Sequence, residues 1–175
     1  MILCTLPLFV IAQEDTLTAN AISYRGSIEN GLSAEENYER ALKAFEGSFG
    51  TYSGTKLNYH SSTTDSLHAS SRVNFEQYAI QNRNATRGPI RFNIGIKAEE
   101  KMVSYHLYQF IHTGNTDERM GPKSFGELTD RVTSPKIPGI TRVSRNIIWQ
   151  EIKDTVDVNI KKRILEFEEQ LGRTF

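Results

Sequence analysis

The chain has 175 residues, of which 38% are hydrophobic and 24% charged, and its 21 basic side chains are balanced by 21 acidic ones. These values are typical of one globular domain, and the zero net charge excludes a long-range attraction to nucleic acid or to an anionic membrane. The single cysteine, Cys4, excludes an internal disulfide framework.

The first 13 residues form an apolar segment that differs in composition from the rest of the chain. The segment is too short to span a bilayer, and Val10-x-Ala12 offers the small-residue pattern that signal peptidases cleave, here before Gln13. This pattern favours a signal peptide without its basic start, followed by one exported domain over residues 14–175 with no membrane span. The alternative is an N-terminal strand or helix that packs on the core.

Residues 21–28 are predicted to form a first strand, because their apolar side chains fall at strand spacing. Ser33 then opens a capping box, in which its hydroxyl accepts from the Glu36 amide while the Glu36 carboxylate reaches back. Apolar residues three or four positions apart follow, and they predict an amphipathic helix that Gly47 and Gly50 end. The predicted buried face of this helix comprises Tyr38, Ala41, Leu42, Phe45 and Phe49.

Alternation of apolar and polar residues returns after the helix. Residues 51–60 and 70–80 each show the period of two that is typical of a strand with one buried face. A third alternating run, residues 90–97, is followed by the polar residues 98–101 and by a fourth run over residues 103–112. Two such runs joined by a short polar turn predict a β-hairpin.

The alternation in the second strand of this hairpin changes phase after Leu107. Val103, Tyr105 and Leu107 fall on one face, so that a regular strand would place Phe110 on the opposite, solvated face. One extra residue near Tyr108-Gln109 would return Phe110 to the buried face, and we therefore predict a β-bulge there.

Residues 114–143 contain three of the five prolines and show no clear periodicity, which predicts a long loop that Phe125 and Leu128 attach to the core. The chain then closes with a predicted amphipathic helix over residues 145–171. Its apolar stripe comprises Ile148, Ile152, Val156, Ile160, Ile164, Phe167 and Leu171. Its solvated side is predicted to carry Lys161, Lys162, Arg163, Glu166, Glu168 and Glu169.

The predicted order of elements is β-α-β-β-β-β-α, which belongs to the α+β class. Because every predicted strand has one apolar face, we expect a single antiparallel sheet of about five strands. Both helices should cover its apolar face, since they supply the matching apolar surface. The opposite face of the sheet should then be open to solvent.

Three stretches resemble those of a known family: residues 31–41 at the start of the first helix, the hairpin of residues 90–112, and residues 149–153. Together with the order of elements, they resemble a domain-of-unknown-function family with a TBP-like fold, common in secreted proteins of Bacteroidetes-type bacteria. The resemblance spans most of residues 20–171 and implies a TBP-like fold and export. The family has no established activity, so the resemblance implies no site residues.

We predict no catalytic, metal or cofactor site. The sequence contains no Gly-x-Ser-x-Gly motif and no glycine-rich phosphate loop. His106 and His112 are six positions apart in one predicted strand, roughly 20 Å in an extended chain, so they cannot share one ion. Both histidines are predicted to face solvent.

The sequence favours a non-covalent binding module of the periplasm or cell envelope, with a protein, peptide or glycan as its partner. Arg91, Asn93, His106 and Tyr108 are the candidate contact residues, because they fall on the open face of the predicted hairpin. A nucleic-acid partner is not expected, since a DNA-bending sheet needs a basic face with apolar wedges.

Three alternatives to a binding module stay open. The first is a solvated sheet face without any ligand. The second is an enzyme whose site lies under the loop of residues 114–143, where two or more ionisable groups would have to converge. The third is a structural envelope subunit that pairs with a partner through an edge of the sheet.

Overall fold

A computed structural model describes residues 21–61, 65–76, 84–116 and 121–172, so the predicted signal peptide of residues 1–13 lies outside the described residues. Eight helices and strands follow one another along the described chain. They are β1 (Tyr24–Glu29), α1 (Ala34–Gly47), β2 (Lys56–Ser61), β3 (Ser66–Phe75), β4 (Gly88–Glu99), β5 (Met102–His112), β6 (Gly126–Glu127) and α2 (Arg142–Gly172). Two short 3-10 helices, η1 (Phe49–Thr51) and η2 (Asn84–Thr86), lie between them.

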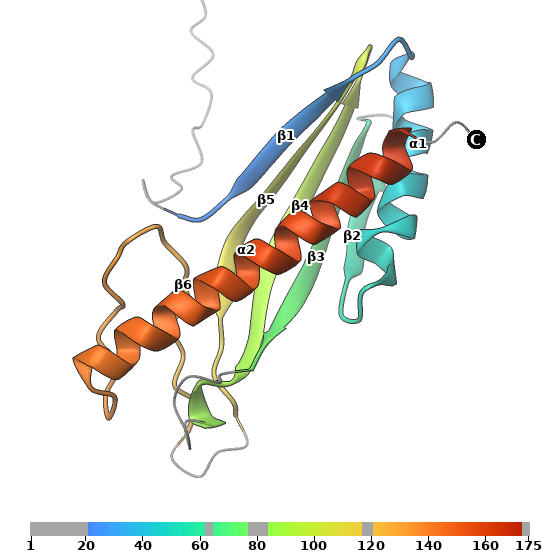
Figure 1. The fold of residues 1–175 in the computed structure, drawn as a ribbon. Coiled ribbons are helices and arrows are strands. Elements are labelled where there is room, and N and C mark those ends of the chain that lie inside the picture. The colour runs from blue at the N-terminus through green and yellow to red at the C-terminus, as the bar shows by residue number, and fades with distance from the viewer. Residues whose placement is uncertain (1–20, 62–64, 77–83, 117–120, 173–175) are drawn as a thin grey trace, which may run out of the picture.

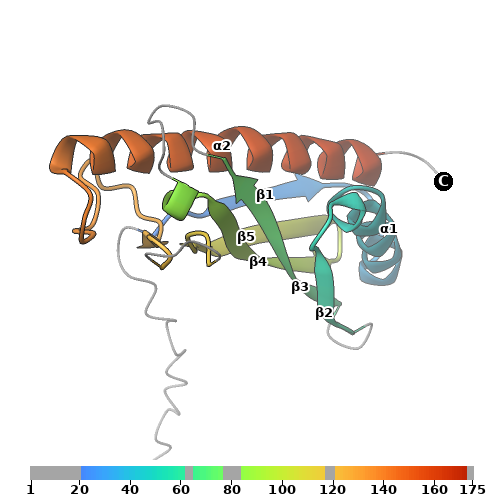
Figure 2. The ribbon, with the colours of Figure 1, turned by 90° about the horizontal axis from the view of Figure 1, so that it is seen from below.

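The strands form one antiparallel sheet in the order β1-β5-β4-β3-β2, and the short β6 also pairs with β5. Both α1 and α2 lie on the same face of this sheet, as Figure 1 and Figure 2 show from two directions. No described helix covers the other face. The predicted α+β fold, a single antiparallel sheet with two helices on one face, is therefore confirmed.

The ends of the elements follow mostly from local signals. The predicted capping box is present at the start of α1: the Ser33 amide donates to Glu36 Oε2 (2.9 Å) and the Glu36 amide to Ser33 Oγ (3.3 Å). Helix α2 begins at Arg142, earlier than predicted. The reason is a cap that we missed, in which the Ser144 amide donates to Thr141 Oγ1 (3.3 Å).

The loop of residues 114–143 contains one strand that its sequence pattern did not predict. Strand β6 pairs with the end of β5, where Ile111 lies opposite Glu127 and His112 opposite Gly126. Phe125 and Leu128 flank β6 and are both buried, so the prediction that they attach this loop to the core is confirmed.

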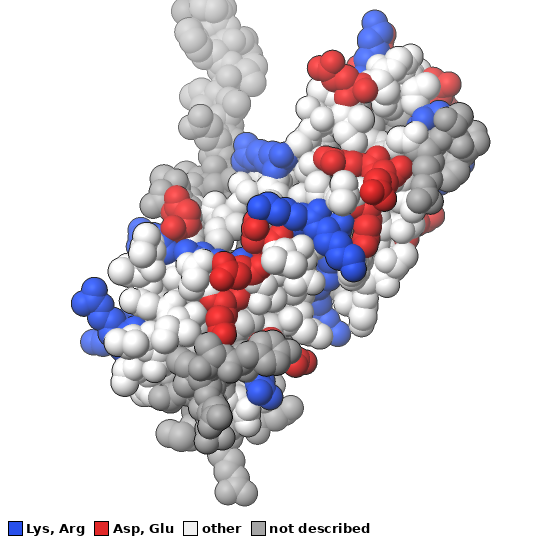
Figure 3. Space-filling model, viewed as in Figure 1, with Lys and Arg blue, Asp and Glu red and all other residues white. Residues whose placement is uncertain are grey.

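The outer surface of α2 carries interspersed basic and acidic side chains (Figure 3). Lys161 Nζ lies 2.8 Å from Asp157 Oδ2 and Lys162 Nζ lies 3.9 Å from Glu166 Oε1, both at i,i+4 spacing. Leu165 is exposed on the same helix. Exposed pairs of this kind stabilise a helix by only a few tenths of a kcal/mol.

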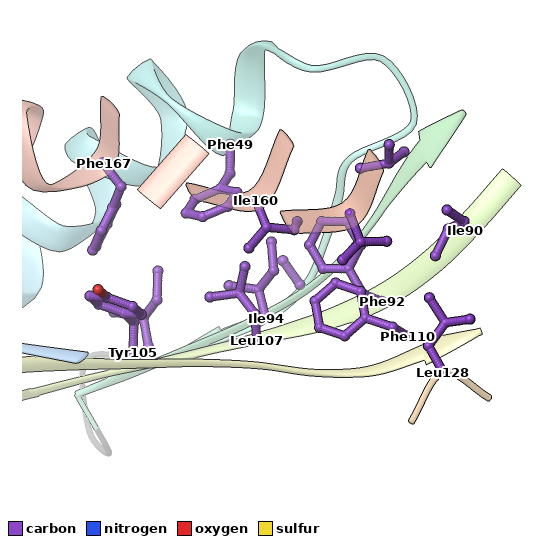
Figure 4. Packing of buried hydrophobic residues seen from close by; sticks show 14 of the residues in the cluster. Phe49, Ile90, Phe92, Ile94, Tyr105, Leu107, Phe110, Leu128, Ile160 and Phe167 are labelled. Atoms are coloured by element: carbon purple, nitrogen blue, oxygen red, sulfur yellow. The ribbon is translucent and has the colours of Figure 1, made fainter. Parts of the chain in front are cut away.

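The core lies between the helices and the apolar face of the sheet (Figure 4). Phe92 and Ile94 of β4 are each 1% exposed, as their alternation with polar neighbours predicts. They pack beside Leu107 of β5 and beneath Ile160 of α2. Burial of apolar area in such a core stabilises the folded state by about 25 cal/mol per Å².

The predicted β-bulge is present in β5. Arg91 pairs with Ile111 and Asn93 with Tyr108, so β5 advances one residue more than β4 between the same two pairs. Gln109, the extra residue, has a φ of 56°, a left-handed conformation that bulges accommodate. The bulge reverses the side-chain alternation and turns Phe110 into the core, as expected.

The same bulge makes one of our predictions wrong. His112 was expected to face solvent, but its side chain is 0% exposed, because the reversed alternation points it to the helix side.

Strand β2 contains a second bulge, between Leu57 and Tyr59. The residue that follows this bulge, His60, contacts α1, because His60 Nδ1 lies 3.0 Å from Tyr38 Oη.

Arg163 is a further correction. It was assigned to the solvated side of α2, yet it is only 4% exposed. Its guanidinium donates to Ser71 Oγ (2.9 Å) and to the Arg72 carbonyl (3.0 Å) on β3, and its central carbon lies 3.9 Å from the centre of the Tyr52 ring. The guanidinium thus joins α2 to the sheet, and burial lowers the pKa of Arg163.

Position 26 of β1 requires a glycine, because the Tyr105 side chain lies too close to leave room for a Cβ atom. A Cβ atom there would overlap the ring and hydroxyl of Tyr105, which is held by a hydrogen bond from its hydroxyl to Glu168 Oε1 (2.7 Å). We expect Gly26→Ala to lower the free energy of unfolding by about 2 kcal/mol through overpacking, as measured by urea denaturation. Gly31→Ala is the matched control, because a Cβ at Gly31 meets nothing within 4 Å. Equal losses in the two variants would contradict this account.

Candidate functional site

The four residues predicted to form a binding site lie together on the open face of the sheet. Arg91 and Asn93 belong to β4, and His106 and Tyr108 to β5. All four alternate with buried residues of the same strands, so their side chains point away from the helices. Asn93 lies directly opposite Tyr108 in the register.

The His106 and Tyr108 rings stack, with their centres 4.8 Å apart and an angle of 29° between their planes. Both side chains are partly exposed. Burial, with a contribution from the Arg25 guanidinium, lowers the pKa of the His106 imidazole. His106 Nε2 is buried and has no hydrogen-bond partner among the described residues.

A residue without a side chain lies beside this stack. Gly95 of β4 is opposite His106 on one side and His68 of β3 on the other. The glycine has no side chain, and a Cβ atom there would lie 3.9 Å from Nδ1 and Cε1 of His68. The backbone of Gly95 is therefore flanked by the His68 ring on one side and by the backbone carbonyl of His106 on the other.

The approach of His68 and Gly95 to His106 was not predicted from the sequence. Alternation with buried neighbours placed Gly95 on the solvated face, but His68 lay outside every predicted strand, and only the register between strands brings both beside His106. Gln109 was not predicted as a site residue either; its amide oxygen accepts from Asn93 Nδ2 at 2.5 Å. Gln109 reaches Asn93 because the bulge inserts it between Tyr108 and Phe110.

The open face has mixed charge. Its basic side chains are spread over four strands, and a salt bridge of 2.6 Å joins Lys97 to Glu99. This pattern differs from the continuous basic stripe that binds a phosphate backbone. The basic residues of the face are Arg25, Lys56, Arg72, Arg91 and Lys97, and carboxylates at its margin are Glu29, Glu99 and Glu127.

His112, by contrast, has a structural environment at the far end of β5. Its Nδ1 accepts from the Phe125 amide (3.1 Å), so Nε2 carries the proton and donates to the Thr86 carbonyl (3.0 Å). Burial lowers the pKa of His112 to about 4. The neutral ring thus joins β5 to the loop before β6 and to η2.

A cavity of about 260 Å³ opens near this end of the sheet, and it brings together the ionisable residues Glu76 and Arg87. Its lining also includes Asn74, Phe75, Gly88, Pro89 and Asn115.

Among the described residues, no group of three or more His, Cys, Asp or Glu side chains is placed to hold a metal ion. None of the described helices is both long and apolar enough to cross a membrane.

Comparison with known proteins agrees with this fold. Residues 27–113 match the family model described as a domain of unknown function (DUF4468) with TBP-like fold. The structure is similar to the crystal structure of a TBP-like protein from Parabacteroides distasonis, with a TM-score of 0.61, 9% sequence identity, and coverage of 89% of this chain and 95% of that one.

A second similar structure is that of a DUF4468 family protein from Bacteroides ovatus, with a TM-score of 0.56, 10% identity and coverage of 88% of each chain. At such low identity these likenesses concern the fold alone. No curated protein matches the sequence. The family resemblance seen in the sequence is confirmed: residues 27–113 match the DUF4468 family of domains with a TBP-like fold.

Proposed function

We propose that the protein is an exported, non-covalent binding module of the periplasm or cell envelope, and that its open sheet face holds a protein, peptide or glycan. The observation that carries this proposal is the stacked His106–Tyr108 pair beside the bare backbone of Gly95, on a face that no described helix covers.

The physical reason is that this face offers several favourable contacts at once. Stacked rings provide rigid apolar area that loses little entropy when a ligand covers it. Asn93 and Tyr108, which lie opposite each other and are partly exposed, add polar groups beside the rings. The exposed guanidinium of Arg91 adds a charge-assisted donor on the neighbouring strand. A ligand lying across β4 and β5 reaches all three.

The test is a comparison of partners captured from envelope extract by wild type and by the double variant Arg91→Ala/Tyr108→Ala. We expect the double variant to bind the partner roughly ten-fold more weakly or worse, because it removes contacts from the centre of the face. The double variant Lys162→Ala/Leu165→Ala is the matched control, since it removes one cation and one exposed apolar side chain from the outer side of α2. Identical partners and affinities for all three proteins would overturn the proposal.

Export is tested separately by sequencing the N-terminus of the protein isolated from its natural source. We expect the mature chain to begin at Gln13, after the Val10-x-Ala12 pattern. An intact Met1 would overturn the assignment of a cleaved signal peptide without affecting the role of the open face.

A further inference from the structure

Strand β1 forms one outer border of the sheet and pairs, among the described strands, only with β5. Its register with β5 is regular from Tyr24↔Leu107 to Glu29↔Met102. The opposite border, β2, is interrupted by the bulge between Leu57 and Tyr59. Bulges are a common device against pairing at a sheet edge, so the two borders differ in their capacity to accept another strand.

The direction of the β1 backbone groups follows from one hydrogen bond. The Asn30 amide donates to the Lys101 carbonyl (2.7 Å), in the same register as β1 and β5. Because backbone groups alternate between the two sides of an antiparallel strand, the even-numbered residues of β1 face β5. The N–H and C=O groups of Arg25, Ser27 and Glu29 therefore point away from the sheet.

The side chains of the same three residues carry a symmetric arrangement of charge. Arg25, Ser27 and Glu29 are all exposed and lie on the open face. Arg25 precedes Ser27 by two positions and Glu29 follows it by two. Neither charged group forms a salt bridge with another described residue.

We propose that a second copy of this chain pairs with β1 through an antiparallel contact centred on Ser27. In this register Ser27 lies opposite Ser27 of the second copy, and each Arg25 lies opposite a Glu29 on the same face. Every one of these pairs exchanges both of its N–H···O=C hydrogen bonds, because these are the residues whose backbone groups point outward. Opposite charges placed directly across two strands attract each other.

The charges also select this register over its neighbours. A shift of two residues in either direction places each charge opposite a serine or a glycine, and a shift of four places like charges opposite each other. The two-fold axis is perpendicular to the sheet, so the open faces of both copies form one continuous surface. This inference is independent of what the open face binds.

The first test is disulfide cross-linking of Ser27→Cys in a background that carries Cys4→Ser. Residues in a hydrogen-bonded pair have Cα atoms about 5.5 Å apart, which suits a disulfide. We expect mild oxidation to yield a covalent dimer. Ser104→Cys is the matched control, because Ser104 lies opposite Ser27 on β5 and faces the same side. Its copies lie about 14 Å apart across three strand spacings and should not cross-link.

The second test reverses the charges and measures the dimer dissociation constant by sedimentation equilibrium. Arg25→Glu or Glu29→Arg alone should raise this constant about ten-fold or more, and the double variant should restore it to within about three-fold of wild type. Both residues are exposed, and unchanged melting temperatures at low protein concentration would show that the variants fold. A wild-type protein that is monomeric at all concentrations, equal cross-linking at positions 27 and 104, or a double variant as weak as the single ones would overturn the proposal.

Discussion

Lowering the pH from 7 to 4 is expected to reduce the free energy of unfolding by about 3 kcal/mol through His112 alone. Burial lowers the pKa of this imidazole to about 4 in the folded protein, from 6.5 for an exposed histidine. Between these two pH values the unfolded chain binds a proton that the folded protein does not. The contribution of the neutral ring is therefore complete above pH 6.5 and is lost as the pH falls toward 4, at about 1.4 kcal/mol per pH unit.

The geometry around His112 explains why the folded protein resists this proton. Nδ1 accepts from the Phe125 amide, so protonation at Nδ1 breaks that hydrogen bond. The new charge would also lie between the rings of Phe75 and Phe125, whose centres are 5.8 Å and 5.5 Å from that of His112. Aromatic neighbours replace water poorly around a charged group.

The measurement is urea denaturation of wild type and His112→Gln at a series of pH values. A glutamine amide can donate to the Thr86 carbonyl and accept from the Phe125 amide, but it does not titrate. The stability difference between pH 7 and pH 4 should be smaller in His112→Gln by about 3 kcal/mol. Leu165→Ala, an exposed substitution on α2 that removes no titratable group, serves as the control and should keep the wild-type pH dependence. An unchanged pH profile in His112→Gln would contradict the assignment.

Arg163→Ala is expected to lower the free energy of unfolding by about 3 kcal/mol. The substitution removes two hydrogen bonds to β3, leaves the buried Arg72 carbonyl without this donor, and empties the space over the Tyr52 ring. The stacking contact adds to the loss, since a desolvated cation over an aromatic face contributes about 1–2 kcal/mol. Chemical denaturation monitored by circular dichroism measures the effect.

Two further variants identify the cause of this loss. Lys162→Ala removes the neighbouring cation from the exposed side of α2 and should change stability by about 0.5 kcal/mol or less. Arg163→Lys keeps the charge but loses the planar fork that reaches both acceptors, so it should recover only part of the stability. A fully stable Arg163→Lys protein would show that charge alone, without the hydrogen-bond geometry, holds α2 at this point.

The sequence predicted those parts of the fold that depend on local patterns. The hairpin of β4 and β5, the capping box at Ser33 and most of α2 follow from periodicity and short-range hydrogen bonds. The burial of Arg163 was not predicted, because its charge was given more weight than its position along the helical repeat. Arg163 lies three residues after Ile160 and four before Phe167, which places it on the buried stripe. Its partner Ser71 is 92 residues away in sequence, and no local pattern reveals that contact.

The open face shows the same division between local and long-range information. Alternation placed Asn93, His106 and Tyr108 on the solvated side, as observed. The position of Gly95 between His68 and His106 depends on the register between three strands, which alternation within one strand does not determine. The inward position of His112 was accessible from the sequence, because the bulge that turns Phe110 inward also turns His112.

The order of strands in the sheet also determines when each strand can pair during synthesis on the ribosome. Strands β3, β4 and β5 are neighbours both in sequence and in the sheet, so they can assemble as soon as they are synthesised. Tyr24 of β1 cannot pair until its partner, Leu107 of β5, has been synthesised roughly 80 residues later. Strand β1 therefore joins the sheet only after β5 has been synthesised, and until then a nascent chain can lend it to the β5 of a neighbour in a domain-swapped pair.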